Sequence, residues 1–371
     1  MKNLNNIIRK LASAEPIIVF VLFVLTAVSA SSVSAQQFQL VSTPDHEYNF
    51  SNLFNDQLGN LPQTPVITGI GFKDGFIYGG ADDRFVYKFN ATTGTPEKIQ
   101  SSNAWVRSVS VSPVKGDYTI AALSQDGRLF TWDSRNDAQK KSVKTSEGGR
   151  SLAYAPNGKY IAVAGSGSAT IDIFDANSLS LVANWSAPTG GTTSVVFSNY
   201  GDKLAAGGRS GTVYVWSNKG QKIFEINLTH EYFNNQPRPN VARRVRAIAF
   251  SKDDSLIAIA GDSNTIVVCD AATGKVVKKL TMYDAEGKST NGKIYSLAFC
   301  DNQHLVSGDS LNQVVLWDVV AGKQIGEPCV EHTGTVSSLF YVPKEEDPNA
   351  GFSYVLSAGY DTKIIRWRIQ Q

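Results

Sequence analysis

The stretch NQVVLWDVVAGKQIG, residues 312–326, shows the pattern from which the fold of this chain is predicted. An apolar run ends in Trp and Asp, a turn containing Gly follows, and a second short apolar run comes next, which is typical of a β-hairpin. The same arrangement recurs in ATIDIFDANSLSLV (169–182), GTVYVWSNKGQKI (211–223) and NTIVVCDAATGKVV (264–277). The chain is therefore built from a repeated unit, and the spacing of that unit indicates the architecture.

Seven such hairpins can be aligned, and one column of the alignment measures the period. This column holds Phe89, Trp132, Phe174, Trp216, Cys269, Trp317 and Trp367. Successive members are 43, 42, 42, 53, 48 and 50 residues apart. Periods of about 40–45 residues with several strands per unit are typical of a β-propeller, whose sheets stack radially to bury both faces. Polar insertions at 228–244, 282–292 and 343–351 account for the longer intervals and are expected to be surface loops.

Each column residue is preceded by two further strand-like segments of recognisable composition. The first ends in a polar turn, as in VRSVSVSPVKGD (106–117), GRSLAYAPNGKY (149–160) and VRAIAFSKDDS (245–255), and the second is rich in small residues, as in LAAGGRSG (204–211). This pattern resembles the WD-repeat family over roughly residues 66–369. The resemblance implies an all-β, seven-bladed β-propeller made of four-stranded antiparallel blades.

The resemblance also implies how the ring of blades closes. The last unit ends in IIRWRIQQ (364–371), directly after its third strand, and the family takes the missing outer strand from the N-terminus, which removes an exposed sheet edge. The expected closing strand is QQFQLVST (36–43). We therefore predict a signal peptide or membrane anchor at 1–35, a closing strand and linker at 36–65, and the propeller at 66–371.

The stabilising tetrad of the WD-repeat family, a hydrogen-bonded His, Ser or Thr, Asp and Trp, is complete in one unit. Its members here are His332, Ser357, Asp361 and Trp367. In other units the Asp position, six residues before the Trp column, holds Asp83, Asp126, Ser168, Ser210, Ser263 or Leu311. The repeats are therefore degenerate, and we assign the tetrad residues to structure and not to function.

The first 35 residues have a different composition from the repeats. Basic residues precede the apolar run IIVFVLFVLTAV (17–28), and Val33 and Ala35 stand at the −3 and −1 positions of a secretory cleavage site. The run is shorter than the roughly 20 residues that a spanning helix needs. We expect a cleaved signal and an extracytoplasmic (secreted or periplasmic) protein. The alternative is an uncleaved membrane tether through residues 17–28.

A partner-binding face is predicted from the residues that open each inner strand, because in the WD-repeat family they lie at the mouth of the central channel. This column reads Thr68, Arg107, Arg150, Thr193, Arg246, Tyr295 and Ser337. Neighbouring loops add Arg84, Arg128, Arg209, Arg243 and Arg244. Guanidinium groups bind carboxylates and phosphates bidentately, so we expect a protein or acidic peptide partner here. The alternative is a set of solvated charges offset by Asp82, Asp83, Asp126 and Asp262.

Other classes of function find little support in the composition. The formal net charge of +2 implies no general attraction to nucleic acid. The four His and three Cys show no metal-ligand spacing, and neither a nucleophile elbow nor a phosphate-binding loop occurs. We therefore predict a non-enzymatic interaction scaffold with no catalytic residue, metal, cofactor or nucleic-acid partner. The alternative is a cell-envelope propeller enzyme or small-ligand sensor that uses the channel mouth.

Overall fold

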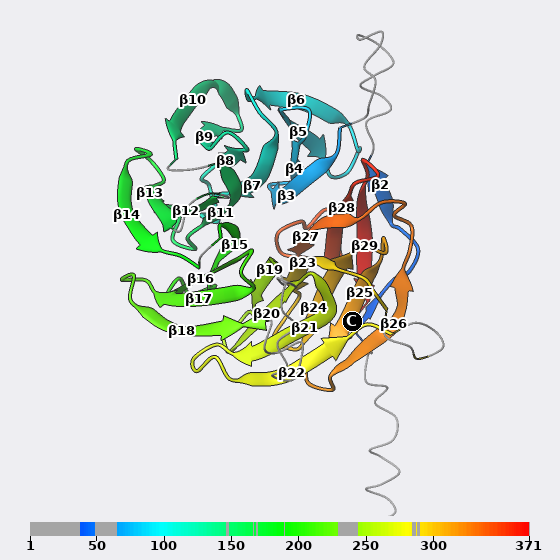
Figure 1. Ribbon diagram of the computed structural model, residues 1–371. Helices are drawn as coiled ribbons and strands as arrows, with labels where there is room; N and C mark the ends of the chain where they lie inside the picture. Colours follow the sequence, from blue (N-terminus) through cyan, green and yellow to red (C-terminus); the bar gives the residue numbers. More distant parts are fainter. Residues whose placement is uncertain are drawn as a thin grey trace, which may run out of the picture. The chain divides into compact units, whose positions relative to one another are not determined.

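A computed structural model describes residues 38–48, 65–145, 148–165, 167, 170–188, 190–228, 244–283, 287 and 290–370. The chain divides into a unit of Gln39–Ile369 and a second unit of Met1–Phe38 with Gln370–Gln371, and the propeller is the first of these. Its described elements are β-strands, which form seven antiparallel sheets arranged around one axis (Figure 1). The predicted seven-bladed propeller is confirmed.

Each blade takes its strands in chain order, from the axis outward. The inner strands are β3 (Ile67–Lys73), β7 (Val106–Val111), β11 (Gly149–Tyr154), β15 (Thr192–Phe197), β19 (Val245–Phe250), β23 (Ile294–Phe299) and β27 (Val336–Val342). The second strands are β4 (Phe76–Ala81), β8 (Thr119–Ser124), β12 (Tyr160–Gly165), β16 (Lys203–Gly208), β20 (Leu256–Gly261), β24 (His304–Asp309) and β28 (Tyr354–Gly359).

The third strands carry the Trp column, and the outer strands cover the blades. The third strands are β5 (Phe85–Asn90), β9 (Arg128–Asp133), β13 (Thr170–Asp175), β17 (Thr212–Ser217), β21 (Ser263–Asp270), β25 (Val314–Asp318) and β29 (Ile364–Gln370). The outer strands of the first six blades are β6 (Pro96–Ser101), β10 (Asn136–Lys144), β14 (Leu181–Ser186), β18 (Lys222–Asn227), β22 (Val276–Thr281) and β26 (Lys323–Cys329).

The hydrophobic core lies between neighbouring blades. In β25, the residues Val314 to Trp317 are all buried, although side chains alternate between the two faces of a strand. Trp317 belongs to a cluster that includes Ile266 and Leu280 of the preceding blade. Both faces of the third strand are therefore packed against another sheet, which explains the continuous apolar run VVLW.

Hydrogen bonds from small hydroxyl side chains bridge the inner strands of adjacent blades. In chain order the bridges are Thr68 Oγ1 to Val106 O, Leu152 N to Ser108 Oγ, Val195 N to Ser151 Oγ, Thr193 Oγ1 to Val245 O, Ser296 Oγ to Val336 O and Ser337 Oγ to Ile67 O. At the remaining junction, between the fifth and sixth blades, the Arg246 guanidinium lies over the Tyr295 ring at 4.1 Å. The inner ring is thus held at each of its seven junctions.

The N-terminal segment completes the last blade with two short strands. β1 (Gln39–Leu40) and β2 (His46–Tyr48) both pair with β29, and the amides of Val41 and Asp45 donate to the carbonyls of Arg368 and Arg366 at 2.9 Å. The predicted closure by an N-terminal strand is confirmed. The predicted end of the closing strand, Thr43, is wrong. Pairing with β29 resumes after a bend and extends to Tyr48, five residues beyond Thr43.

Tyr48 anchors this closing segment to the first blade as well as to the last. Its side chain is 1% exposed, and its ring meets Phe89 edge-on at 6.3 Å between centroids. Its hydroxyl donates to the carbonyl of Ala91 at 2.7 Å. The segment that supplies the outer strand of the seventh blade is therefore also part of the junction with the first.

The complete tetrad forms a hydrogen-bonded relay in the seventh blade. His332 Nδ1 lies 2.9 Å from Asp361 Oδ2, and His332 Nε2 lies 2.7 Å from Ser357 Oγ. Trp367 Nε1 donates to the same Ser357 hydroxyl at 2.7 Å. Burial acts to raise the pKa of Asp361, but the hydrogen bond and charge of His332 outweigh it, so this pKa lies below its usual value.

The sixth blade keeps the bond between Trp and Ser of this relay, and its buried carboxylate lies at a different position. Trp317 Nε1 donates to Ser307 Oγ at 2.9 Å, but the acidic residue is Asp309, two positions after Ser307, and not the aligned Leu311. Asp309 is fully buried; its Oδ1 accepts from the amides of Leu311 and Gln313 at 2.8 and 3.0 Å. Within the described residues its Oδ2 has no hydrogen-bond partner. Burial raises the pKa of Asp309 to about 6.

Replacing Tyr48 by Ala should lower the free energy of unfolding by about 3–5 kcal/mol, because it removes a buried aromatic ring from the closing segment. Tyr48→Phe should cost only about 1 kcal/mol, since it removes a single hydrogen bond. Urea unfolding followed by tryptophan fluorescence measures both. Tyr200→Ala, at a residue that is 75% exposed, is the control and should change stability by less than about 0.5 kcal/mol. Equal effects of the Tyr48→Ala and Tyr200→Ala changes would contradict a structural role for the closing segment.

Asp309 should make stability depend on pH. Because its pKa is higher in the folded state than its ordinary value of 3.8, its contribution is greatest in acid and is lost as the pH rises through about 6. Between pH 5 and pH 8 this loss amounts to about 1.4 kcal/mol. Asp309→Asn should therefore gain stability relative to the native chain by that amount over the same range.

The measurement is a pair of urea titrations at each pH. Asp74→Asn, at an exposed turn position, is the matched control and should leave the difference between the two pH values unchanged. If Asp309→Asn and the native chain lose the same stability between pH 5 and pH 8, the buried carboxyl does not titrate as described.

Candidate partner-binding face

The residues that open the seven inner strands meet around one end of the central channel. All seven members of the predicted column line a single hollow of about 270 Å³, to which every blade contributes. Radial stacking explains this convergence, because the first residue of each inner strand occupies the same position in its blade. Residues as distant in the chain as Thr68 and Ser337 therefore share one rim.

The rim has two chemical parts. Thr68, Thr193 and Ser337 use their hydroxyls to bridge neighbouring blades, so they belong to the framework. The second part consists of the longer polar side chains, those of Arg107, Arg150, Arg246 and Tyr295.

Arg107 is held in place by an aromatic ring and an amide. Its guanidinium lies 4.5 Å from the centroid of the Trp105 ring, and its Nη2 donates to Gln125 Oε1 at 2.6 Å. Its Nε is buried and has no partner among the described residues. Desolvation lowers the pKa of Arg107. The guanidinium is therefore fixed in position without being neutralised by a carboxylate in hydrogen-bonding contact.

Arg150 lies among like charges. Within the described ranges no hydrogen bond or ion pair engages its side chain. Desolvation lowers the pKa of Arg150, and the positive charges of Arg107, Arg209 and Arg244 lower it further. The other three charges therefore act on Arg150, and an anion placed beside Arg150 would relieve this repulsion.

Arg246 differs from the other arginines because it is already paired. Its Nε lies 2.5 Å from Asp262 Oδ1, and its guanidinium covers the Tyr295 ring. At Arg246 the structure agrees with the alternative interpretation, in which the charge of the arginine is offset by an acidic residue. Arg246 and Tyr295 therefore act first as the junction between the fifth and sixth blades.

The loop arginines are distributed unevenly around the rim. Arg209 is exposed in the turn after β16, and Arg244 directly precedes β19 with a buried Nε that has no partner among the described residues. Arg84 is exposed in the turn after β4, at a positive φ of 78°, and does not line the hollow. Arg128 donates to Ser142 Oγ of the outer strand at 3.4 Å. Arg243 lies outside the described residues.

The acidic residues of these loops are mostly occupied by the backbone and by hydroxyls. Asp82 accepts from the amide of Val66 at 2.9 Å, Asp83 accepts from Tyr87, and Asp126 accepts from Ser124. Of the four, Asp262 is the one that forms an ion pair with a rim arginine in the described part of the chain. Arg107, Arg150, Arg209 and Arg244 therefore form a concentration of positive charge in a protein whose net charge is only +2.

Two aromatic residues at this rim were not singled out from the sequence. Trp105 is 46% exposed beneath Arg107, and Tyr360 is 49% exposed with its ring 6.3 Å from that of Tyr295. Burial and the neighbouring Tyr295 raise the pKa of Tyr360, whereas the charges of Arg246, Arg107 and Arg150 oppose this shift. Their positions in the sequence could have identified them. Trp105 lies two residues before Arg107 of the strand-opening column, and Tyr360 lies in the β28–β29 turn.

The described residues contain no group of three or more His, Cys, Asp or Glu placed to hold a metal ion. Cys269, Cys300 and Cys329 are buried free thiols. In the same ranges no helix has the length and apolar composition to cross a membrane. The signal peptide or tether predicted within residues 1–35 lies outside the described residues.

Comparisons with known proteins agree with the fold. A family model for the WD40 domain of anaphase-promoting complex subunit 4 matches residues 195–302. Cell division cycle 20.1 of Arabidopsis thaliana, a cofactor of that complex, is 23% identical over 303 residues, which cover 77% of this chain and 60% of the relative. A WD repeat-containing protein of Schizosaccharomyces pombe is 23% identical over 224 residues, which cover 58% of this chain and 36% of the relative. The chain thus spans less than two thirds of either relative.

A solved structure extends the comparison to the whole propeller. A chain in the crystal structure of a mitotic checkpoint complex superposes with a TM-score of 0.69, covering 90% of this chain and 94% of that chain at 16% sequence identity. The likeness in fold therefore persists where the sequences have diverged. Together with the seven aligned repeats and the complete tetrad of the last blade, these matches show that the chain is similar to WD-repeat proteins and has the fold of a seven-bladed β-propeller, with degenerate repeats.

Proposed function

We propose that this propeller is a non-catalytic scaffold and that the arginine-lined rim binds an acidic segment of a protein partner. The observation that carries the proposal is the grouping of Arg107, Arg150, Arg209 and Arg244 at a rim where Arg150 has no ion-pair partner among the described residues. Desolvation lowers the pKa of Arg150, and the charges of the other three arginines lower it further. An acidic peptide would supply the missing negative charge. Each guanidinium can hold a carboxylate with two parallel hydrogen bonds, which gives orientation as well as affinity.

The framework around these arginines suits recognition of a partner. Hydrogen bonds and one cation–π contact hold the inner strands at their junctions, so the rim is presented on a rigid support. Trp105 and Tyr360 expose aromatic surface beside the charges. Aromatic residues and Arg are the side chains most enriched at the centres of protein interfaces.

The named assemblies of the similar proteins support a role in protein interaction. The Arabidopsis relative is named as a cofactor of a protein complex, and the similar solved chain comes from a checkpoint complex. The alternative, an envelope enzyme or small-ligand sensor using this mouth, would need converging His or carboxylate side chains. The opening ring offers arginines, hydroxyls and one tyrosine instead.

Replacing both Arg107 and Arg150 by Ala should weaken binding of an acidic peptide by tenfold or more, because each charge-assisted hydrogen bond contributes about 1.5–3 kcal/mol. Fluorescence anisotropy of a labelled octaglutamate peptide measures this, at about 50 and 200 mM salt, and the affinity should fall as salt is raised. The control is Arg135→Ala, which removes one exposed guanidinium from the turn between β9 and β10. An unchanged affinity in the double variant would refute the proposal.

Arg246→Ala provides a further contrast within the same rim. Since Arg246 is already paired with Asp262, its loss should reduce peptide affinity less than the loss of Arg150. It should instead lower stability, because it removes the contact between the fifth and sixth blades. Anisotropy and urea unfolding of the two single variants distinguish these effects, and the reverse order of affinities would contradict the assigned roles.

We further propose that the propeller is exported or tethered to a membrane by its N-terminal segment. The support is the basic, apolar and small-residue pattern of residues 1–35. Cleavage after Ala35 would leave the closing strands intact, because β1 begins at Gln39. N-terminal sequencing of the protein from fractionated, expressing cells should find Gln36 first. An intact N-terminus in the membrane fraction would indicate the tether, and an intact N-terminus in the soluble fraction would contradict both.

A further inference from the structure

A second hollow lies at the opposite end of the channel. It has a volume of about 640 Å³, within the range of small-ligand pockets. Ile70, Val109, Ile248 and Leu339 line both this hollow and the arginine-lined one, and each is less than 10% exposed. These aliphatic side chains form a waist between the two ends. We call the second hollow the lower chamber.

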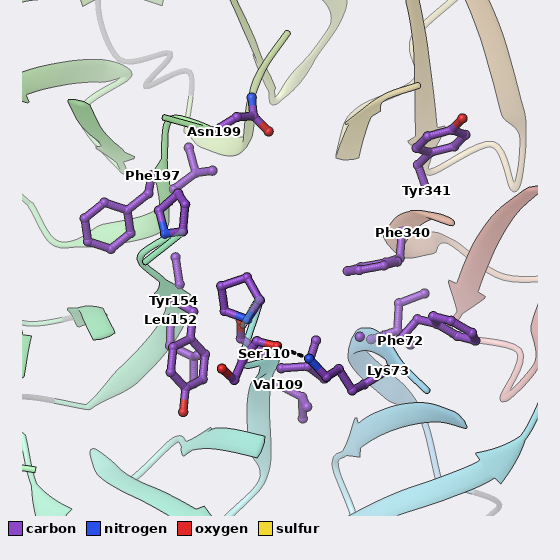
Figure 2. Close-up of a pocket in the computed structure, with 18 of the residues that line it drawn as sticks. Phe72, Lys73, Val109, Ser110, Leu152, Tyr154, Phe197, Asn199, Phe340 and Tyr341 are labelled. Carbon is purple, nitrogen blue, oxygen red and sulfur yellow. Dashed lines mark hydrogen bonds between the residues drawn. The ribbon is translucent and has the colours of Figure 1, made fainter. Parts of the chain in front are cut away.

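The width of the lower chamber comes from small residues on the inner strands. Three positions after the strand-opening residue, the first four blades carry Gly71, Ser110, Ala153 and Val196. The seventh blade carries Phe340 at the same position, and Figure 2 shows its ring directed into the chamber. Aromatic side chains line the chamber on both sides, because Tyr154 and Phe197 lie across it from Phe340 (Figure 2).

Two lysines line the chamber, and their surroundings differ. The Lys73 ammonium donates to the carbonyls of Ser112 and Val114 at 2.9 and 2.7 Å, so its hydrogen-bonding capacity is largely met (Figure 2). Lys252, just after β19, extends its ammonium to 5.2 Å from the ring centroid of Tyr341 in the seventh blade. Among the described residues no carboxylate lies within ion-pair distance of Lys252.

The charge of Lys252 is incompletely compensated. Desolvation lowers its pKa, although Cys300, Asp301 and Glu346 act in the opposite direction. Lys252 is exposed, and Glu346 also lines the chamber without forming an ion pair with it in the described part of the chain. A cation held over an aromatic ring, with no carboxylate in contact, is the complement of a single negative charge. The walls beside it, including Phe340 and Tyr341, are the complement of a ring.

We propose that the lower chamber binds a small aromatic carboxylate, with its carboxylate paired to Lys252 and its ring packed against Phe340 and Tyr341. The lower chamber adjoins the arginine-lined hollow through the aliphatic waist, but its charged lining is different: Lys252 lines the chamber, whereas Arg107 and Arg150 line only the other hollow. One ammonium recognises one negative charge, whereas the several guanidiniums of the rim suit a segment with many. The two ends of the channel thus select ligands of different charge and size.

The test uses 2-naphthoate and its uncharged isostere 2-naphthamide, titrated into the full-length protein by isothermal titration calorimetry. We expect naphthoate to bind saturably with one site per chain and naphthamide to bind at least tenfold more weakly, a difference of about 1.4 kcal/mol. Lys252→Met should reduce naphthoate affinity to that of naphthamide and leave naphthamide unchanged. Lys159→Met, which removes an exposed lysine in the β11–β12 turn, is the matched control and should change neither.

A second variant tests the chamber by volume instead of charge. Ser110→Leu should fill the space between the small residues and weaken both ligands by tenfold or more, with circular dichroism and the thermal midpoint reporting that the fold is kept. The Arg107→Ala, Arg150→Ala double variant should bind naphthoate like the native chain even where it has lost the acidic peptide. The proposal is overturned if naphthoate fails to bind, if Lys252→Met binds it normally, or if the rim variant abolishes its binding.

Discussion

The antiparallel pairing of β29 with β1 and β2 is the interaction on which the rest of the structure depends. A stack of sheets that bury their faces against one another has two ends, and β29 would present its unpaired backbone groups at one of them. Pairing with the N-terminal strands satisfies those groups, and Tyr48 carries the contact across to Phe89 and Ala91 of the first blade. Once the ring is closed, Ser337 reaches Ile67, and the inner strands surround one axis.

Closure converts a repeat in the chain into a ring of equivalent positions. All seven inner strands contribute their first residues to the arginine-lined rim, four of them form the aliphatic waist two positions later, and six of them, all except β23, line the lower chamber. Residues that are close together on one inner strand can therefore line the two ends of the channel, which differ in chemistry. Degeneracy of the repeats matters for function here, because identical blades would give seven identical side chains at each level and could not concentrate charge on one part of the rim.

Departures from the WD-repeat pattern are compensated locally. In the seventh blade the relay from His332 to Trp367 is complete, whereas the sixth blade keeps the bond between Trp317 and Ser307 and moves its carboxylate to Asp309. Burial raises the pKa of that carboxyl group, and the two backbone amides that donate to one of its oxygens lower it only in part. The junction between the fifth and sixth blades likewise replaces a hydroxyl bridge by the Arg246–Tyr295 contact.

From the sequence alone, the period of the Trp column predicted seven blades. The resemblance to the WD-repeat family implied closure from the N-terminus and a rim containing Arg107 and Arg150. The number of blades follows from spacing, since equal intervals in the chain become equal positions around the axis. The tertiary structure decided which charges are neutralised, that the sixth blade buries Asp309 on backbone amides, that pairing extends to Tyr48, and that Trp105 and Tyr360 lie beside the arginines. Such facts depend on distances between blades, which no one-dimensional pattern contains.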